Sequence, residues 1–253
     1  NESRSLNIAH YKGKMLNEIW GYETVGIAQS QQEMDSHLAS NKPSWGSSWS
    51  AGDIMYKDLN GDGVVNTGAN TVDNPGDRKI IGNSTPRYNF GLTLDAEWNG
   101  FDFSVFFQGV GKRDYWLSGP YFWGASGGMW QSAGFKQHWD FWRGENDPLG
   151  ANLKAYYPRA NFDGTKNQYV QSGYLQNAAY IRMKNIQLGY TLPKQWTSKA
   201  GLSSVRLYVS GDNLLTISDI TGIFDPETLG GDWGDGKLYP LCKTISVGLN
   251  VNF

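Results

Sequence analysis

Alternation between apolar and polar residues with a period of two is the feature that most constrains how this chain can fold. Successive side chains of a β-strand point to opposite faces, so this period predicts strands with one apolar and one polar face. The pattern occurs in five stretches, at 88–98, 101–110, 180–192, 204–215 and 244–253. The sequence therefore predicts an all-β fold built from antiparallel strands.

The first two stretches are joined by Asn99-Gly100, a dipeptide that strongly favours a two-residue hairpin turn. The residues that flank such a turn pair with each other, so Trp98 and Phe101 are expected on the same face. This register gives both strands one common apolar face. Its members are Tyr88, Phe90, Leu92, Leu94, Ala96, Trp98, Phe101, Phe103, Val105 and Phe107.

Short and long connections alternate between the predicted strands along the chain. The connections at 99–100 and 193–203 are short or moderate, whereas those at 111–179 and 218–243 are long. Outer-membrane barrels combine short periplasmic turns with long external loops. Five strands, with a further candidate at 14–29, are fewer than the eight of the smallest known barrels. We therefore expect this chain to be part of a larger barrel.

Composition excludes several other classes of protein. The 253 residues include 22 basic and 24 acidic side chains, a balance that offers no basic surface for nucleic acid. A single cysteine, Cys242, excludes an internal disulfide framework and a four-cysteine zinc site. No run of 18 apolar residues occurs, which excludes a transmembrane helix but leaves a transmembrane β-barrel open.

Several stretches resemble the SusC/RagA family of TonB-dependent outer-membrane transporters. They are GYETVGIAQSQQEMD (21–35), GDIMYKDLNGDGVVN (52–66), IIGNSTPRYNFGLTLDAEWNGFDFSVFFQGVGKRDYW (80–116), YIRMKNIQLGYTLP (180–193), RLYVSGDNLLTIS (206–218) and ISVGLNVNF (245–253). Together they span nearly the whole chain in the order that the family has them. The resemblance implies that residues 1–253 form about five or six strands of the carboxy-terminal part of a 22-stranded transmembrane β-barrel with long extracellular loops, without the family's plug domain.

The same resemblance implies a function in nutrient uptake across the bacterial outer membrane. Members of the family import oligosaccharides, and some import peptides, with energy from the TonB complex and a SusD-like surface lipoprotein as a lid. Contact with TonB would be made through amino-terminal parts that are missing here, and contact with lipid through the barrel. The resemblance implies no enzymatic activity and no nucleic-acid partner.

Two other functions remain open from the residues alone. A secreted, aromatic-rich carbohydrate-binding β-domain would show the same alternation, because the period does not reveal which solvent surrounds the sheet. A glycoside hydrolase would need two carboxylates about 5–10 Å apart, and no spacing in the sequence singles out such a pair.

The last stretch also has the features of an assembly signal. Apolar residues alternate up to a terminal aromatic residue, as in the sequences that outer-membrane proteins use for assembly. The residues concerned are Ile245, Val247, Leu249, Val251 and Phe253. The simpler interpretation is a last strand that ends in a hydrophobic residue.

The segment 58–64 resembles the first half of a calcium-binding loop. Oxygen ligands at alternate positions suit Ca²⁺, and here they would come from Asp58, Asn60, Asp62 and the carbonyl of Val64. The bidentate Glu expected at position 12 is replaced by Ala69, and Asp73 or Asp77 could substitute only through an altered path of the loop. The alternative is a tight Asn-Gly and Asp-Gly turn that needs no metal. No cofactor is required by the predicted function.

Aromatic residues are concentrated in the two long connections. The candidates for contact with substrate or lid are Trp116, Tyr121, Trp123, Trp130, Trp139, Trp142 and Trp233. Their rings could stack on sugars, with Asp140, Arg143 and Asn146 as hydrogen-bonding neighbours for hydroxyl groups. They could instead form the core of the loop or meet the lid lipoprotein, since tryptophan suits packing and interfaces alike.

Overall fold

The computed structural model describes residues 5–6, 11–124, 134–161, 165–230 and 235–253. Strands dominate the regular structure of these residues, which confirms the predicted all-β class. The chain divides into two units. Unit 1 comprises Asn1–Thr85, Asp114–Gln176 and Leu229–Leu238, and unit 2 comprises Pro86–Arg113, Asn177–Thr228 and Tyr239–Phe253.

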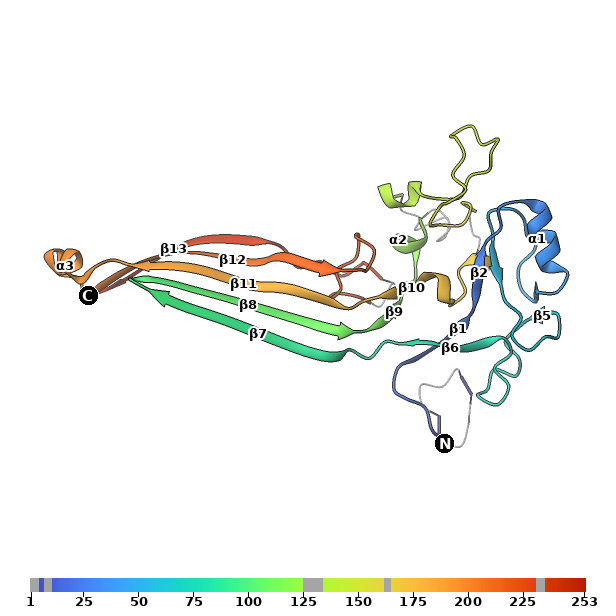
Figure 1. Ribbon diagram of the computed structural model, residues 1–253, viewed down its shortest axis with the longest axis horizontal. Helices are drawn as coiled ribbons and strands as arrows, with labels where there is room; N and C mark the ends of the chain where they lie inside the picture. Colours follow the sequence, from blue (N-terminus) through green and yellow to red (C-terminus); the bar gives the residue numbers. More distant parts are fainter. Residues whose placement is uncertain (1–4, 7–10, 125–133, 162–164, 231–234) are drawn as a thin grey trace. The chain divides into compact units, whose positions relative to one another are not determined.

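Unit 2 is a five-stranded antiparallel sheet in the order β13-β12-β11-β8-β7 (Figure 1). Its strands are β7 (Arg87–Trp98), β8 (Phe101–Lys112), β11 (Tyr180–Thr191), β12 (Ser204–Ser218) and β13 (Thr244–Asn252). Each overlaps one of the five stretches that the alternating pattern marks. Trp98 pairs with Phe101 across the Asn99-Gly100 turn, which is the register that the dipeptide predicts. Two short helices, α3 (Lys194–Thr197) and η5 (Ser198–Ala200), occupy the connection between β11 and β12.

The register aligns the apolar residues of all five strands on one face. Leu188 of β11, for example, lies opposite Phe103 of β8 and Val209 of β12, and Val209 lies opposite Val247 of β13. Val105 of β8 is buried on this face, but many other large side chains of the face are exposed, from 43% for Phe90 to 78% for Val247. They are Phe90, Leu92, Leu94, Trp98, Phe101, Leu188, Leu207, Val209, Leu215, Ile217, Ile245, Val247 and Leu249. An exposed apolar surface of this extent marks a face that something else covers.

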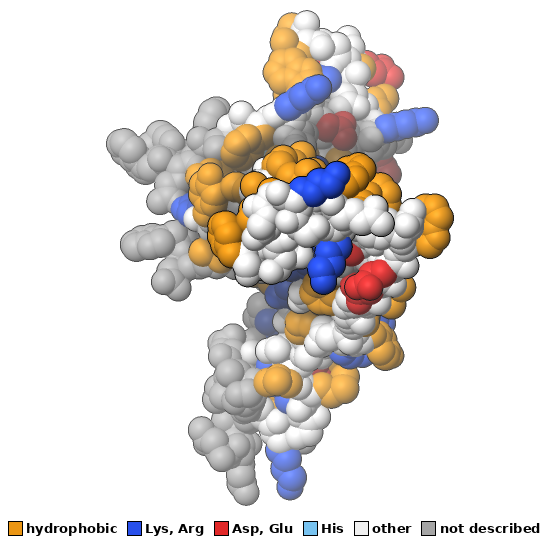
Figure 2. All heavy atoms as spheres, turned by 90° about the vertical axis from the view of Figure 1, so that its left-hand side faces the viewer, with side chains coloured by type: hydrophobic (Ala, Val, Ile, Leu, Met, Phe, Trp, Pro, Cys, Tyr) orange, Lys and Arg blue, Asp and Glu red, His pale blue; other side chains and the backbone are white. Residues whose placement is uncertain are grey.

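One end of the sheet carries α3 together with the β7–β8 turn. In the view onto this end, hydrophobic side chains lie openly at the surface beside Lys and Arg side chains (Figure 2). No helix among the described residues combines the length and the apolar character that crossing a membrane requires.

The opposite face of the sheet is polar, and an ion pair spans three of its strands. Arg206 of β12 forms an ion pair with Asp102 of β8, with an Nε–Oδ2 distance of 2.8 Å, although β11 lies between the two strands. The reach across β11 depends on Gly189, because a Cβ at this position would come within 2.6 Å of Arg206 Nε. The Arg206 guanidinium also lies 5.0 Å from the ring centroid of Tyr208. The glycine of the alternating pattern thus makes room for a polar link between non-adjacent strands.

Unit 1 contains small two-stranded sheets and one helix of eight residues. The pairs are β1 (Glu18–Tyr22) with β6 (Arg78–Asn83), β2 (Thr24–Ile27) with β4 (Ile54–Tyr56), β3 (Lys42–Pro43) with β5 (Val64–Val65), and β9 (Asp114–Trp116) with β10 (Leu175–Asn177). The helix α1 (Gln31–Leu38) starts at Ser30, whose Oγ accepts the N–H of Glu33. Met34 of this helix packs with Ala28 and Met55.

The candidate strand at 14–29 is divided in the structure. Its residues form β1 and β2, which pair with β6 and β4 in unit 1 and do not add to the five-stranded sheet. The long connection at 111–179 likewise has secondary structure of its own. Besides β9 and β10 it contains α2 (Pro120–Trp123), η2 (Lys136–Trp139), η3 (Thr165–Asn167) and η4 (Ser172–Tyr174).

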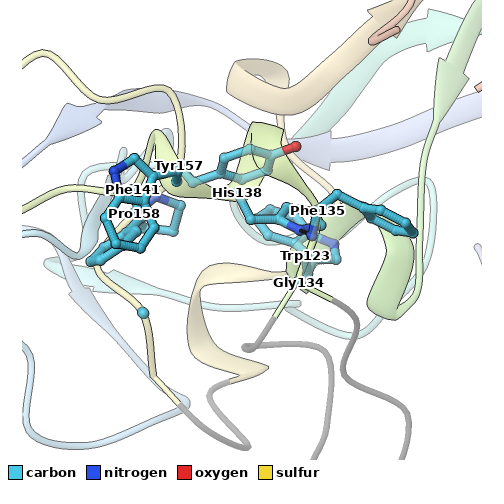
Figure 3. Close-up of a pocket in the computed structure, with 9 residues that line it drawn as sticks. Trp123, Gly134, Phe135, His138, Phe141, Tyr157 and Pro158 are labelled. Carbon is cyan, nitrogen blue, oxygen red and sulfur yellow. Dashed lines mark hydrogen bonds between the residues drawn. The ribbon is translucent and has the colours of Figure 1, made fainter. Parts of the chain in front are cut away.

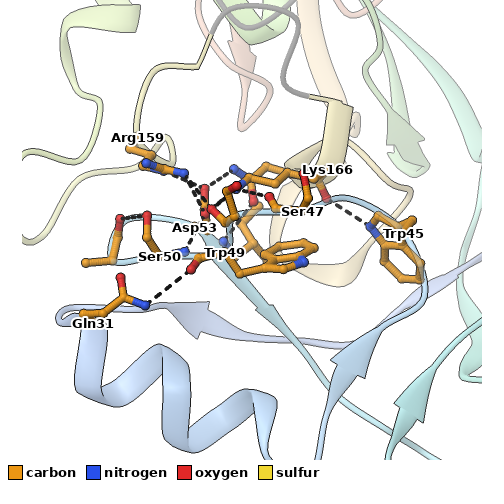
Figure 4. A network of polar contacts seen from close by, with 12 residues as sticks. Gln31, Trp45, Ser47, Trp49, Ser50, Asp53, Arg159 and Lys166 are labelled. Carbon is orange, nitrogen blue, oxygen red and sulfur yellow. Dashed lines mark hydrogen bonds and ion pairs between the residues drawn. The ribbon is translucent and has the colours of Figure 1, made fainter.

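A buried ion-pair network holds the loops of unit 1 together (Figure 4). Asp53, which is fully buried, pairs with Lys166 Nζ at 2.6 Å and with Arg159 Nε at 2.9 Å. Its Oδ1 also accepts a hydrogen bond from Asn167 Nδ2 at 2.9 Å. Burial by itself raises the pKa of Asp53, but the hydrogen bonds from Arg159, Lys166 and Asn167 outweigh it and leave the pKa below its usual value.

Candidate functional site

A cavity of about 240 Å³ lies in unit 1 and is walled mainly by aromatic side chains (Figure 3). The residues that line it are Trp123, Gly134, Phe135, His138, Trp139, Phe141, Tyr157, Pro158 and Ala160. They come from α2, from η2 and from the strand-like segments around Phe141 and Tyr157, which form a parallel bridge. Ring faces of this kind pack against the apolar face of a sugar or against a nonpolar side chain.

The histidine of this cavity is fixed by the backbone around it. His138 Nδ1 accepts the N–H of Phe135 at 3.0 Å, so the ring proton lies on Nε2. Nε2 in turn faces the carbonyl oxygens of Tyr121 at 3.0 Å and Phe122 at 3.2 Å. Both ring nitrogens are therefore occupied in holding the loop. This arrangement suits a structural histidine and leaves no free nitrogen for acid–base chemistry or for a metal.

The structure separates the predicted aromatic candidates into two kinds. Trp123 is 5% exposed and packs on Phe122 and Tyr174, with ring centroids 5.0 Å apart in each case, so it belongs to the core of unit 1. Trp139 is 61% exposed and also lines the cavity. Of the seven candidates, only these two are brought to the cavity by the residues that the structure describes.

The other candidates lie elsewhere. Trp116 packs near Trp123 with a centroid distance of 6.1 Å, and Tyr121 packs against Phe135 at 5.5 Å. Trp142 donates its indole N–H to Gln29 Oε1 at 3.3 Å. Trp130 and Trp233 lie outside the described residues.

The charged neighbours of Trp139 serve the loop itself. Arg143 is 8% exposed, and it donates from Nε to the carbonyl of Gly150 at 2.8 Å and from Nη1 to that of Trp139 at 2.9 Å. Asp140 accepts hydrogen bonds from the side chain of Asn152 at 2.9 Å and from the N–H of Tyr156 at 3.2 Å. These contacts account for Asp140 and Arg143 without a bound hydroxyl group.

Sequence reasoning missed Phe135, Phe141 and Tyr157 as lining residues of the cavity. Their aromatic character was the available signal. Aromatic character alone does not predict the cavity, because these residues come from separate segments of the connection that meet only in the folded chain.

The calcium-like loop is held by its own backbone. Asp58 Oδ1 accepts the N–H groups of Asn60 and Gly61, at 3.1 and 2.7 Å, and Oδ2 accepts that of Gly63 at 2.6 Å. Burial raises the pKa of Asp58, but these donors outweigh it and lower the pKa. The described residues include no group of three or more acidic, His or Cys side chains arranged to hold a metal ion. The contacts fit the tight turn, and calcium binding at 58–64 stays a prediction.

Four residues of the predicted assembly signal lie on β13, at one edge of the sheet, and Phe253 directly follows this strand. Ile245, Val247 and Leu249 are 73%, 78% and 57% exposed on the apolar face, and the terminal Phe253 is 92% exposed. Their role in assembly stays a prediction.

No family profile matches the chain. TonB-dependent receptor P3 of Formosa agariphila is 30% identical over 258 residues, an alignment that covers 96% of this chain and 22% of that protein. TonB-dependent receptor SusC of Bacteroides thetaiotaomicron is 26% identical over 201 residues, which cover 79% of this chain and 17% of SusC. This chain is a homologue of TonB-dependent receptors. The resemblance predicted from its motifs is therefore confirmed.

Solved structures of a peptide importer share the fold of this chain. The RagAB peptide importer in its open-open state aligns with a TM-score of 0.61 and 23% identity, over 93% of this chain and 22% of the importer chain. The RagAB peptide transporter aligns with a TM-score of 0.60 and 21% identity. The predicted barrel-type fold class is thus confirmed. The chain spans about a fifth of the length of the curated relatives that it matches.

Proposed function

We propose that this chain is the carboxy-terminal part of the barrel of a TonB-dependent importer in the bacterial outer membrane. In this proposal the apolar face of the five-stranded sheet meets lipid and the polar face lines the lumen. The observation that carries it is the exposed apolar face, which is continuous across all five strands while the charges Asp102 and Arg206 pair on the other side. Transmembrane barrels distribute apolar and polar side chains in this way.

The two edges of the sheet support a larger barrel. The described part of the sheet ends at β7 on one side and at β13 on the other, and each edge strand has a neighbour on one side only. In a bilayer, unpaired backbone groups at such edges would lack any partner, so further strands must close the sheet. We expect those strands, the plug and the TonB-contacting segment to be supplied by other parts of the receptor.

Import of an oligosaccharide or a peptide is supported by the relatives. The two relatives named above are TonB-dependent receptors, and RagAB is a peptide importer. The aromatic cavity of unit 1, which the exposed Trp139 helps to line, offers apolar faces that suit either class of ligand. A SusD-like surface lipoprotein is the expected partner of the external loops. The relatives are receptors and give no reason to expect an enzyme.

The alternative function is a secreted carbohydrate-binding domain. Such a domain would leave side chains such as Val247 and Ile245, more than 70% exposed, in contact with water along a whole sheet face. The free-energy cost of exposing apolar surface, about 25 cal/mol per Å², argues against that arrangement.

Fractionation of cells that express the full-length receptor tests the proposal. We expect the receptor in the outer-membrane fraction, soluble only with detergent, and with a mobility in gel electrophoresis that changes on boiling. A receptor found in the periplasm or the medium, stable without detergent, would favour the secreted domain.

A further inference from the structure

β11 has a bulge at the point where its polar face carries two basic residues. Its register shifts between Met183 and Asn185 against both neighbouring strands. Lys184 is an extra residue relative to β8, and on the other side it stands against two residues of β12, Asn213 and Leu214. A bulge changes the direction of the side chain at the extra position. Arg182 lies on the polar face, in one row with Gln108 and Thr216, and its Nε donates to Thr216 Oγ1 at 2.8 Å.

Both basic residues pair with acidic residues that follow β12. Arg182 Nη2 lies 2.9 Å from Asp225 Oδ1, and Arg182 Nη1 lies 3.1 Å from Glu227 Oε1. Lys184 Nζ lies 2.8 Å from Glu227 Oε2. The side chains of Arg182 and Asp225 are only 4% and 9% exposed. Two cations and two anions thus form a balanced network that is largely shielded from water.

The segment that supplies the acidic residues also has buried apolar side chains and a backbone carbonyl that accepts a hydrogen bond from beside the sheet. In residues 219–228, Ile220 and Phe224 are 7% and 6% exposed. The carbonyl of Pro226 accepts a hydrogen bond from Arg113 Nη1 at 3.4 Å, directly after the end of β8. A cavity of about 400 Å³ lies between this segment and the strands, lined by Thr216 and Phe224 among others. The segment is therefore anchored to the polar side of the sheet at several points.

We propose that residues 219–228 form a strap that folds inward over the polar face and narrows the lumen of the importer. The inference rests on the proposed function, because the polar face is a lumen only if the sheet closes into a barrel. Arg182 and Lys184 are then positioning residues for the strap, and an imported ligand passes beside its exposed residue Gly222 and its neighbour Ile223.

The strap predicts which part of the 218–243 connection an external reagent can reach. In the full-length receptor with Cys242→Ser, single cysteines are placed at Ile223 in the strap and at Tyr239, which is 83% exposed in the same connection. Intact cells are treated with a membrane-impermeant maleimide carried on a bulky polymer. We expect Tyr239→Cys to react at least about tenfold faster than Ile223→Cys, because the polymer is excluded from the lumen and the strap is held by a buried network.

The second part of the experiment removes the ion pairs of the strap and measures the labelling rate again. Arg182→Ala with Lys184→Ala is expected to raise the reaction rate of Ile223→Cys about tenfold or more, since it leaves Asp225 and Glu227 without partners. Lys194→Ala with Lys199→Ala, which removes two cations from α3 and η5, is the matched control and should leave the rate unchanged.

The outcomes separate the strap from the proposed function. Equal rates at Ile223→Cys and Tyr239→Cys, or no change after removal of Arg182 and Lys184, would overturn the strap in a receptor that is present in the outer membrane. Heat-dependent gel mobility shows whether each variant has folded, and Arg182→Lys, which keeps the charge, should retain slow labelling. Absence of the receptor from the outer membrane would overturn both the strap and the proposed function.

Discussion

Asp53→Asn is expected to destabilise unit 1 by about 3–5 kcal/mol, the cost of removing one partner from a buried ion pair. Lys166 is 6% exposed and would keep its charge without the carboxylate that neutralises it. Hydrogen exchange at the amide of Ile54, which donates to Asn167 Oδ1 at 3.0 Å inside the network, reports the effect. If this amide exchanges through opening of unit 1, its rate should rise about a hundredfold or more.

Glu23→Gln is the matched control for this substitution. Glu23 also pairs with two cations, Lys57 and Lys79, but both lysine side chains are 50% exposed. Exposed pairs of this kind contribute about 0–1 kcal/mol. If Glu23→Gln destabilised unit 1 as much as Asp53→Asn does, burial would not be the reason for the large effect expected at Asp53.

The Asp53 network also predicts the dependence of stability on pH. The pKa of Asp53 is lower in the folded chain than its ordinary value, which is about 3.9 in an unfolded chain. Its stabilisation is therefore complete above about pH 4 and is lost as the pH falls through the folded pKa. The ratio of the Ile54 exchange rates in Asp53→Asn and in the unchanged protein should stay constant at neutral and mildly acidic pH. It should shrink below about pH 4.

Arginine substitutions at two adjacent positions of β12 should have very different effects. Val209 lies on the apolar face, 49% exposed, and an arginine there would meet the hydrocarbon region of the bilayer in the proposed barrel. Val209→Arg is expected to lower the free energy of unfolding by about 2–4 kcal/mol near the midplane. Ser210 lies on the polar face opposite Gln187 and Ser246, and Ser210→Arg should cost less than about 1 kcal/mol.

Denaturant titration of the full-length receptor in lipid vesicles measures both changes. The two substitutions add the same charge and differ by one position in the chain, so the comparison isolates the face of the sheet. Similar losses at Val209 and Ser210, or a larger loss at Ser210, would contradict the assignment of lipid and lumen.

The five long strands could be predicted because their information is local. Alternation fixes the face of each residue, and the Asn99-Gly100 turn fixes the register of the first hairpin. The continuity of the apolar face across β11, β12 and β13 then results from pairing of like faces. The bulge at Lys184 could not be predicted, because the alternation around it is also compatible with an uninterrupted strand.

The fold of unit 1 could not be predicted, because it depends on contacts between residues that are far apart in the sequence. Asp53 and Lys166 are 113 residues apart in the sequence, and neither carries a local signal for the other. The same limit applies to the aromatic site. The sequence supplies the residue types, but only the folded loop separates Trp123, which packs in the core, from Trp139, which remains exposed.

The assignment of the two faces is tested most directly by spin labels on four consecutive residues of β7. Single cysteines at Leu92, Thr93, Leu94 and Asp95, in the full-length receptor with Cys242→Ser, are labelled and reconstituted in lipid bilayers. We predict that oxygen, which concentrates in lipid, relaxes the labels at Leu92 and Leu94, whereas a water-soluble nickel complex relaxes those at Thr93 and Asp95. Equal access of the nickel complex to all four labels, or the opposite alternation, would contradict the account.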